Sequence, residues 1–275
     1  MSGAVVRAFV LRGPEAAAAL DWLHVHADLA GVEELDHALV VYTTAPLPPL
    51  PFPAVEVHEH AVDPALLRLT GLENDRPIHV ADDLLVRPPW VPAPADFLGL
   101  DLVVPRGNAF GSGEHGSTRA ALRCLHRWWG GIEAPPASCL DVGTGSGILA
   151  LYAKARGTQG IAACDIDAPS VAAARELLPG ARIVVGGPEQ LPAADLVLAN
   201  MTGSELTAVM PLLLARWTRR AALVLSGMRR AEVGPVTALV PEPPAWFETV
   251  DEFTAACFPG AAGWPPARRG HGAVR

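Results

Sequence analysis

From about residue 116 onward, short apolar runs alternate with stretches whose apolar residues recur every three or four positions. The short runs predict β-strands and the periodic stretches predict helices between them. The expected strands are "SCLDV", "IAACDID", "ARIVVGG", "ADLVLAN" and "AALVLSG", with a final strand pair near "WFETVDEFTAACF". The expected helices are "STRAALRCLHRWW", "GILALYAKAR", "PSVAAARELL" and "SELTAVMPLLLARW". Apolar strands joined by helices indicate a largely parallel sheet covered on both faces, so this part predicts a doubly wound α/β fold.

The first part of the chain has a different pattern. The stretches "AVVRAFVLR", "HALVVYTT" and "AVEVHEH" read as strands, "PEAAAALDWLHVHADLA" as an amphipathic helix, and "DPALLRL" as a short helix. The run "APLPPLPFP" is too rich in proline for a helix or a central strand, which leaves a loop or a sheet edge. We therefore expect a small α/β module with an antiparallel sheet.

Proline also guides the expected domain boundaries. A second proline-rich tract, "RPPWVPAPADFLGL", is typical of an interdomain linker. We expect a small domain at 1–95 that includes this linker, a larger domain at 96–260, and a tail at 261–275. The tail carries little packing signal and is expected to be disordered.

Composition narrows the class of protein. Half of the 275 residues are hydrophobic and 18% are charged, which allows a well-buried core. The formal net charge of -8 argues against a broad contact with nucleic acid or an anionic membrane. The four cysteines form neither a CxxC motif nor a cluster with histidine, so we expect no metal site and a reducing compartment. No stretch resembles a signal peptide or a membrane span. A cytoplasmic monomer is the expectation.

The stretch "CLDVGTGSGILAL" joins the first of these parallel strands to a helix. Gly143, Gly145 and Gly147 allow a tight turn and a close approach of a ligand to the backbone, at a helix N-terminus that favours an anionic group. Asp165 ends the next strand, 22 positions after Gly143, where an acidic residue typically holds ribose hydroxyls. A ligand that contains a nucleoside is therefore expected. The spacing G-x-G-x-G after Asp141 differs from the dinucleotide pattern and resembles class I S-adenosylmethionine-dependent methyltransferases.

Two further segments sharpen this resemblance. The segments "NAFGSGEHGSTRAAL" and "DLVLANMTGSEL", together with "RPIHVADDLLVRPPWV" and "ILALYAKARG", resemble the PrmA family, the methyltransferases of large-subunit ribosomal protein L-eleven. The resemblance runs from about Arg76 to Phe258. It implies a class I methyltransferase domain preceded by a small α/β substrate-recognition domain. It also implies S-adenosylmethionine as cofactor and lysine nitrogens of that ribosomal protein as acceptors, with the α-amine as a further candidate.

The resemblance assigns roles to individual positions. The residues that it places at the cofactor are Phe110, Thr118, Gly143, Gly145, Asp165 and Asn200. Phe110 would lie near the sulfonium as a cation-π partner. Asn200 and the backbone carbonyl of Met201 would face the acceptor amine and orient it, and no general base is assigned.

Alternatives stay open for several of these residues and for the acceptor. Asn200 is also a good N-cap residue for the helix that follows, and His115 either orders its loop or accepts a proton. Asp167 is expected to order the loop after its strand. Because "NMTG" departs from the family's pattern, a second hypothesis is a methyltransferase of the same fold that acts on another protein, such as a flavoprotein subunit, or on a small molecule. A third is a non-catalytic nucleoside-binding module, against which Asp165, Asn200 and the glycine loop count.

Overall fold

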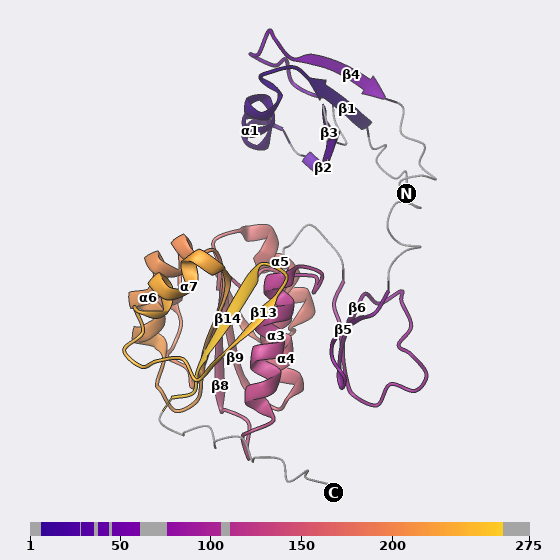
Figure 1. Cartoon of the computed structure of the whole chain (residues 1–275). Coiled ribbons are helices and arrows are strands. Elements are labelled where there is room, and N and C mark those ends of the chain that lie inside the picture. The colour runs from indigo at the N-terminus through magenta and orange to yellow at the C-terminus, as the bar shows by residue number, and fades with distance from the viewer. Residues whose placement is uncertain are drawn as a thin grey trace, which may run out of the picture. The chain divides into compact units, whose positions relative to one another are not determined.

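The computed structural model describes residues 7–27, 29–35, 38–43, 46–60, 76–105 and 111–260. The chain divides into two compact units, Met1–Asp75 and Arg76–Arg275 (Figure 1). The expected short helix at "DPALLRL" and the tail 261–275 lie outside the described residues. None of the helices in the described ranges combines the length and the apolar character that crossing a bilayer requires.

The first unit contains a four-stranded antiparallel sheet in the order β2-β3-β1-β4. Its elements are β1 (Arg7–Arg12), α1 (Ala16–His26), β2 (Leu29–Leu35), β3 (Ala38–Thr43) and β4 (Glu56–His60). Phe9, Leu11 and Val41 of the sheet are buried together with Ala19 and Leu23 of α1. The helix therefore packs on one face of the sheet, and the small α/β module with an antiparallel sheet is present as the sequence predicted.

Residues 46–55, which contain the prolines of the first proline-rich run, form neither helix nor strand, as expected. The apolar residues Leu47, Leu50 and Phe52 of this segment pack against the cluster that α1 covers, so the segment adds to this core. The sequence did not predict β2. Gly31 and the two glutamates of "LAGVEEL" interrupt the apolar alternation of a strand, and the pairing of β2 with β3 shifts its register between Leu29 and Gly31.

The second unit contains a seven-stranded sheet in the order β10-β9-β8-β11-β12-β14-β13. Its strands are β8 (Ser138–Val142), β9 (Gly160–Asp165), β10 (Arg182–Val185), β11 (Leu196–Asn200), β12 (Leu223–Arg229), β13 (Trp246–Val250) and β14 (Phe253–Phe258). The strands from β10 to β12 are parallel neighbours, and β14 and β13 are antiparallel additions at one edge. The doubly wound, mostly parallel sheet that the sequence predicted is confirmed.

Helices cover both faces of this sheet (Figure 1). They are α3 (Gly116–Trp129), α4 (Ile148–Ala155), α5 (Ala168–Leu177), α6 (Gly203–Arg216) and α7 (Arg230–Thr237), with a short 3₁₀ turn η2 (Pro188–Gln190). Buried residues of α3, α4 and α5 form one apolar cluster with the sheet, and those of α6 and α7 form a second. The sequence did not predict α7, because "RAEVGPVT" contains a glycine and a proline that disfavour a helix.

A second, three-stranded sheet corrects the expected domain boundary. It consists of β5 (Ile78–Ala81), β6 (Leu84–Arg87) and β7 (Leu100–Val103), with β6 parallel to β7. The tract 87–100 is therefore the crossover between two paired strands and not a linker between domains. Arg87 holds it by donating to Asp101 at 2.8 Å and to the carbonyl of Val91 at 2.6 Å. The division falls at Asp75/Arg76 rather than near residue 95.

Candidate active site

The carboxyl ends of three parallel strands carry the residues that the sequence analysis selected. β8 leads into the glycine loop 143–147, β9 ends at Asp165, and β11 ends at Asn200. Because β8 lies between β9 and β11 in the sheet, the three ends meet at one edge. In doubly wound sheets this edge is where ligands bind.

The glycine loop turns sharply from β8 into α4. Gly143, Gly145 and Gly147 have φ angles of 68°, 54° and 91°, in a region that residues with side chains rarely adopt. The N–H groups of Gly143 and Thr144 donate to the carbonyl of Cys164 in β9, at 2.9 and 3.1 Å. Gly147 directly precedes the first residue of α4, so the loop ends at a helix N-terminus that faces the same edge.

The side chain of Met201 packs on the first glycine of this loop. A Cβ atom at Gly143 would lie 2.9 Å from the sulfur of Met201 and 3.1 Å from its Cγ. The backbone conformation therefore favours glycine at 143, and a side chain there would also displace the thioether of Met201. This contact could not be predicted from the sequence, because it joins two loops that are 58 positions apart.

Asp141 lies beneath the loop and is 1% exposed. Its Oδ2 accepts a hydrogen bond from the hydroxyl of Thr144 at 2.7 Å. Burial raises the pKa of the Asp141 carboxyl to about 6, while the Thr144 hydrogen bond acts in the opposite direction. Asp141 therefore supports the loop from inside and does not reach the surface where an acceptor would approach.

Asp165 fixes the loop from the neighbouring strand. Its Oδ2 accepts from the N–H of Gly145 at 2.9 Å and its Oδ1 from the N–H of Asp167 at 3.0 Å. Each carboxylate oxygen has a second lone pair, so both can still accept a hydrogen bond from a ligand. Ile166 follows directly and is 86% exposed, which leaves an apolar side chain uncovered beside the carboxylate. Ile166 was not predicted as a site residue, although an isoleucine directly after an acid that ends a strand is a readable signal.

Thr118 and Asn200 meet at the other side of the loop. The Asn200 Nδ2 donates to the hydroxyl of Thr118 at 3.4 Å, and Thr118 is fully buried. The Oδ1 of Asn200 is buried and has no hydrogen-bond partner within the described ranges. A buried carboxamide oxygen without a partner is costly, so this oxygen is an acceptor available to a bound group.

Asn200 does not cap α6. Thr202 is the N-cap, because its hydroxyl accepts from the N–H of Glu205 at 3.4 Å and the Glu205 carboxylate accepts from the N–H of Thr202 at 2.9 Å. This reciprocal pair satisfies the helix end without Asn200. The capping alternative for Asn200 is therefore wrong.

The backbone of Met201 is held by β12. Its N–H donates to the carbonyl of Ser226 at 3.0 Å. Its own carbonyl oxygen lies beside Gly227, where a Cβ atom would be only 2.2 Å away, and Gly227 has a φ of 91°. The close approach of the two strands' ends requires glycine there. The role of this carbonyl toward an acceptor amine stays a prediction.

The segment before α3 joins the glycine loop from a distant part of the chain. The Ser146 hydroxyl donates to the carbonyl of Gly111 at 2.7 Å. His115 is the N-cap of α3, and its Nδ1 accepts from the N–H of Ser117 at 3.3 Å. His115 thus orders the start of the helix that carries Thr118, as one of its two interpretations predicted.

Two further expectations have different outcomes. Asp167 caps α5 by accepting from the N–H of Ser170 at 2.9 Å, which confirms that it orders its loop. Phe110, the expected aromatic partner of the sulfonium, lies outside the described residues. Of the expected cofactor residues, the structure brings Thr118, Gly143 and Asp165 to the same edge as Asn200 and Gly145.

Comparisons with known proteins agree with this geometry. The family model described as "Ribosomal protein L11 methyltransferase (PrmA)" matches residues 71–252. A relative from Chromobacterium violaceum named "Ribosomal protein L11 methyltransferase" is 33% identical over 220 residues, which span 78% of this chain and 70% of that protein. One of the same name from Thiobacillus denitrificans is 37% identical over 177 residues, and the match spans 63% of this chain and 58% of that protein.

A solved structure supports the fold independently. The crystal structure of a ribosomal protein L11 methylase from Lactobacillus delbrueckii subsp. bulgaricus matches with a TM-score of 0.59 at 22% identity. The match covers 66% of this chain and 97% of that one. The second unit therefore has the class I methyltransferase fold, with five parallel strands followed by an antiparallel pair.

Proposed function

This chain belongs to the ribosomal protein L11 methyltransferase (PrmA) family, and on that premise we propose that it transfers methyl groups from S-adenosylmethionine to nitrogen atoms of ribosomal protein L11. The observation that carries the proposal in this chain is the buried Oδ1 of Asn200, which has no partner among the described residues and lies beside Thr118. It is a preformed hydrogen-bond acceptor at the carboxyl-end edge of the sheet, where doubly wound folds bind ligands.

S-adenosylmethionine is the cofactor, and the residues at this edge fit it. The glycine loop at the start of α4 offers room and a favourable dipole for the carboxylate of its amino-acid part. Asp165 retains one free lone pair on each oxygen for the ribose hydroxyls. Ile166 presents an exposed apolar surface on which we place the adenine ring. The cofactor supplies an electrophilic methyl group carried on a sulfonium.

Asn200 orients the acceptor nitrogen in this proposal. An amine must be neutral to attack, whereas a free lysine has a pKa of about 10.4. An apolar, water-poor site lowers that pKa, so the ammonium loses its proton more readily. The Asn200 oxygen then accepts a hydrogen bond from an N–H of the amine. This hydrogen bond directs the lone pair of the amine nitrogen toward the methyl group. Asp141 is not proposed as a base, because it is buried beneath the loop and bonded to Thr144.

We propose lysine side chains as the acceptors, with the α-amine as a further candidate, and we assign recognition of the acceptor protein in part to the first unit. The alternative is a methyltransferase of the same fold that acts on another protein or on a small molecule. This alternative predicts that ribosomal protein L11 gains no mass in the experiment described below. The segment "MTG", directly after Asn200, is where enzymes with these two kinds of acceptor would differ in sequence.

Mass spectrometry of purified ribosomal protein L11, incubated with this protein and S-adenosylmethionine, tests the proposal. We expect additions of about 14 Da per methyl group, and peptide mapping should place them on lysines. Controls lack the cofactor or contain an excess of S-adenosylhomocysteine. If no mass is added while binding of S-adenosylhomocysteine is intact, ribosomal protein L11 is not the acceptor and the alternative is favoured.

A further inference from the structure

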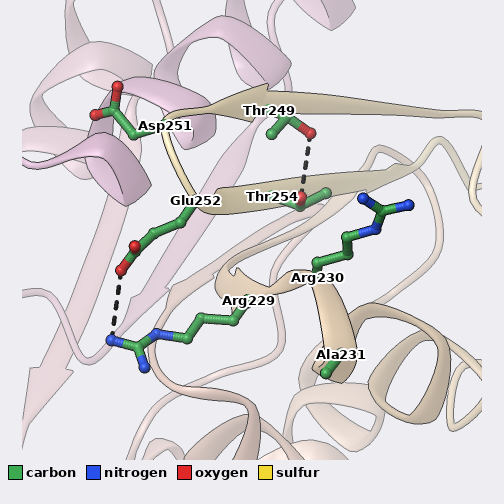
Figure 2. A pocket seen from close by; sticks show the side chains of 7 residues that line it. All are labelled: Arg229, Arg230, Ala231, Thr249, Asp251, Glu252 and Thr254. Carbon is green, nitrogen blue, oxygen red and sulfur yellow. Dashed lines mark hydrogen bonds and ion pairs between the residues drawn. The ribbon is translucent and has the colours of Figure 1, made fainter.

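A cavity of about 720 Å³ lies next to the candidate active site, between the start of α7 and the turn that joins β13 to β14 (Figure 2). It is lined by Arg229, Arg230, Ala231, Thr249, Asp251, Glu252 and Thr254. Its volume falls within the range of roughly 300–1,000 Å³ that is typical of sites that bind small ligands or side chains. None of these residues belongs to the glycine loop or to the cofactor residues assigned above.

The start of α3 connects this cavity to the methyl-transfer site. Asp251, in the cavity wall, pairs with Arg119 at 2.5 Å, and a Cβ atom at Gly116 would lie 2.8 Å from its carboxylate. Arg119 directly follows Thr118, whose hydroxyl contacts Asn200. The turn between β13 and β14 thus packs on the same helix end that supports the acceptor site.

β12 makes the same connection from the other side. Gly227 touches the carbonyl of Met201, the residue after Asn200, and Arg229 in the cavity is two positions further along the strand. At roughly 3.3 Å per residue, the cavity begins within about 7 Å of that contact. A peptide segment lying in the cavity would therefore reach the acceptor site with a neighbouring side chain.

The charges in the cavity are not all paired. Arg229 pairs with Glu252 at 3.4 Å, and Asp251 is held by Arg119. The Thr249 and Thr254 hydroxyls bond to each other at 3.1 Å. Arg230 is exposed and forms no ion pair with any residue that the structure describes. Figure 2 shows its side chain pointing away from Arg229, toward the strands that carry the two threonines.

We propose that this cavity binds a segment of the acceptor protein next to the methylated nitrogen, and that Arg230 pairs there with a carboxylate of that segment. The proposal rests on the proposed function for the identity of the acceptor. A carboxylate fits better than an RNA phosphate chain, because a run of phosphates would need several cations, whereas Arg229 in this cavity is already paired with Glu252. The Arg230 guanidinium, which has no ion-pair partner within the described ranges, matches one carboxylate.

Steady-state kinetics with RNA-free ribosomal protein L11 tests this. The variants are Arg230→Gln, Arg230→Lys and, as a matched control, Arg220→Gln, which removes an exposed arginine before the opposite end of β12. We expect Arg230→Gln to raise KM for the protein about tenfold, with kcat and the affinity for S-adenosylhomocysteine unchanged. Arg230→Lys should recover part of the loss, and Arg220→Gln should match the unsubstituted protein. Thermal unfolding confirms that each variant is folded.

The outcomes separate this inference from the proposed function. If the unsubstituted protein methylates ribosomal protein L11 and Arg230→Gln behaves like Arg220→Gln, the inference alone is overturned. An effect of Arg230→Gln that occurs only with ribosome-bound substrate would assign Arg230 to RNA phosphate and would also overturn it. A protein that neither methylates nor binds ribosomal protein L11 overturns both.

Discussion

Replacing Gly143 with alanine should damage the cofactor site through two separable effects. The backbone effect arises because Gly143 has a φ of 68°, which costs an L-residue roughly 1–2 kcal/mol. The steric effect arises because the new Cβ atom would lie 2.9 Å from the sulfur of Met201. Moving that side chain costs about 1 kcal/mol more, at the low end of the range for overpacked sites. Relief of either strain displaces the loop, so we expect the affinity for S-adenosylhomocysteine to fall at least tenfold.

A double-mutant cycle measured by calorimetric titration with S-adenosylhomocysteine separates the two effects. Met201→Ala removes the sulfur, so Gly143→Ala should cost about fivefold less in that background than in the native one. Gly180→Ala is the matched control, because Gly180 has a φ of 85° and nothing lies within 4 Å of its Cβ position. It should lower stability by about 1 kcal/mol and leave cofactor affinity unchanged. If Gly143→Ala binds as the native protein does, neither effect acts on the cofactor site, and an equal cost with and without the Met201 side chain would exclude the steric effect.

Three further substitutions test the parts of the site separately. Because burial raises the pKa of Asp141 to about 6 from 3.8, the stability that its protonated form contributes is complete below pH 3.8 and is lost as the pH rises through 6. Asp141→Asn should remove this loss, which amounts to at most about 3 kcal/mol. Urea unfolding at pH 4 and 7 measures it, and an equal change in the free energy of unfolding of the variant and the native protein would contradict the prediction. Asp165→Ala removes the acceptor of two backbone N–H groups, so it should weaken S-adenosylhomocysteine binding at least tenfold. Calorimetry measures this affinity, and an unchanged value would contradict the prediction. Thr202→Ala should lower the free energy of unfolding by about 1 kcal/mol, measured with urea, and leave the affinity for S-adenosylhomocysteine unchanged. If stability does not change, Thr202 is not the residue that caps the helix.

The sequence predicted the elements that bury long apolar runs. Strands such as "ADLVLAN" are covered on both faces, so their hydrophobicity is visible without the fold. β5, β6 and β7 have only four residues each and were missed, since so short a run has no clear period. Prolines marked the tract 87–100 as irregular, but they could not reveal that the strands on either side of it pair with each other.

The candidate site was predicted in the same uneven way. Gly145 and Asp165 were recognised from spacing, because the order of parallel strands places consecutive strand ends side by side. The packing of Met201 on Gly143 could not be predicted, since it depends on how two loops fill the same space. The choice between Asn200 and Thr202 as helix cap was readable, because "TGSE" has the spacing of a capping box.

In the proposed mechanism, the Asn200 oxygen orients the acceptor amine and does not chiefly hold the cofactor. The most direct test compares turnover on ribosomal protein L11 with the affinity for S-adenosylhomocysteine in Asn200→Ala, with Asn200→Asp retaining an acceptor oxygen. We predict that alanine lowers kcat roughly 100-fold while the Kd changes less than about threefold, and that aspartate restores part of the rate. Equal losses of turnover and affinity would contradict the claim and make Asn200 a cofactor-binding residue only.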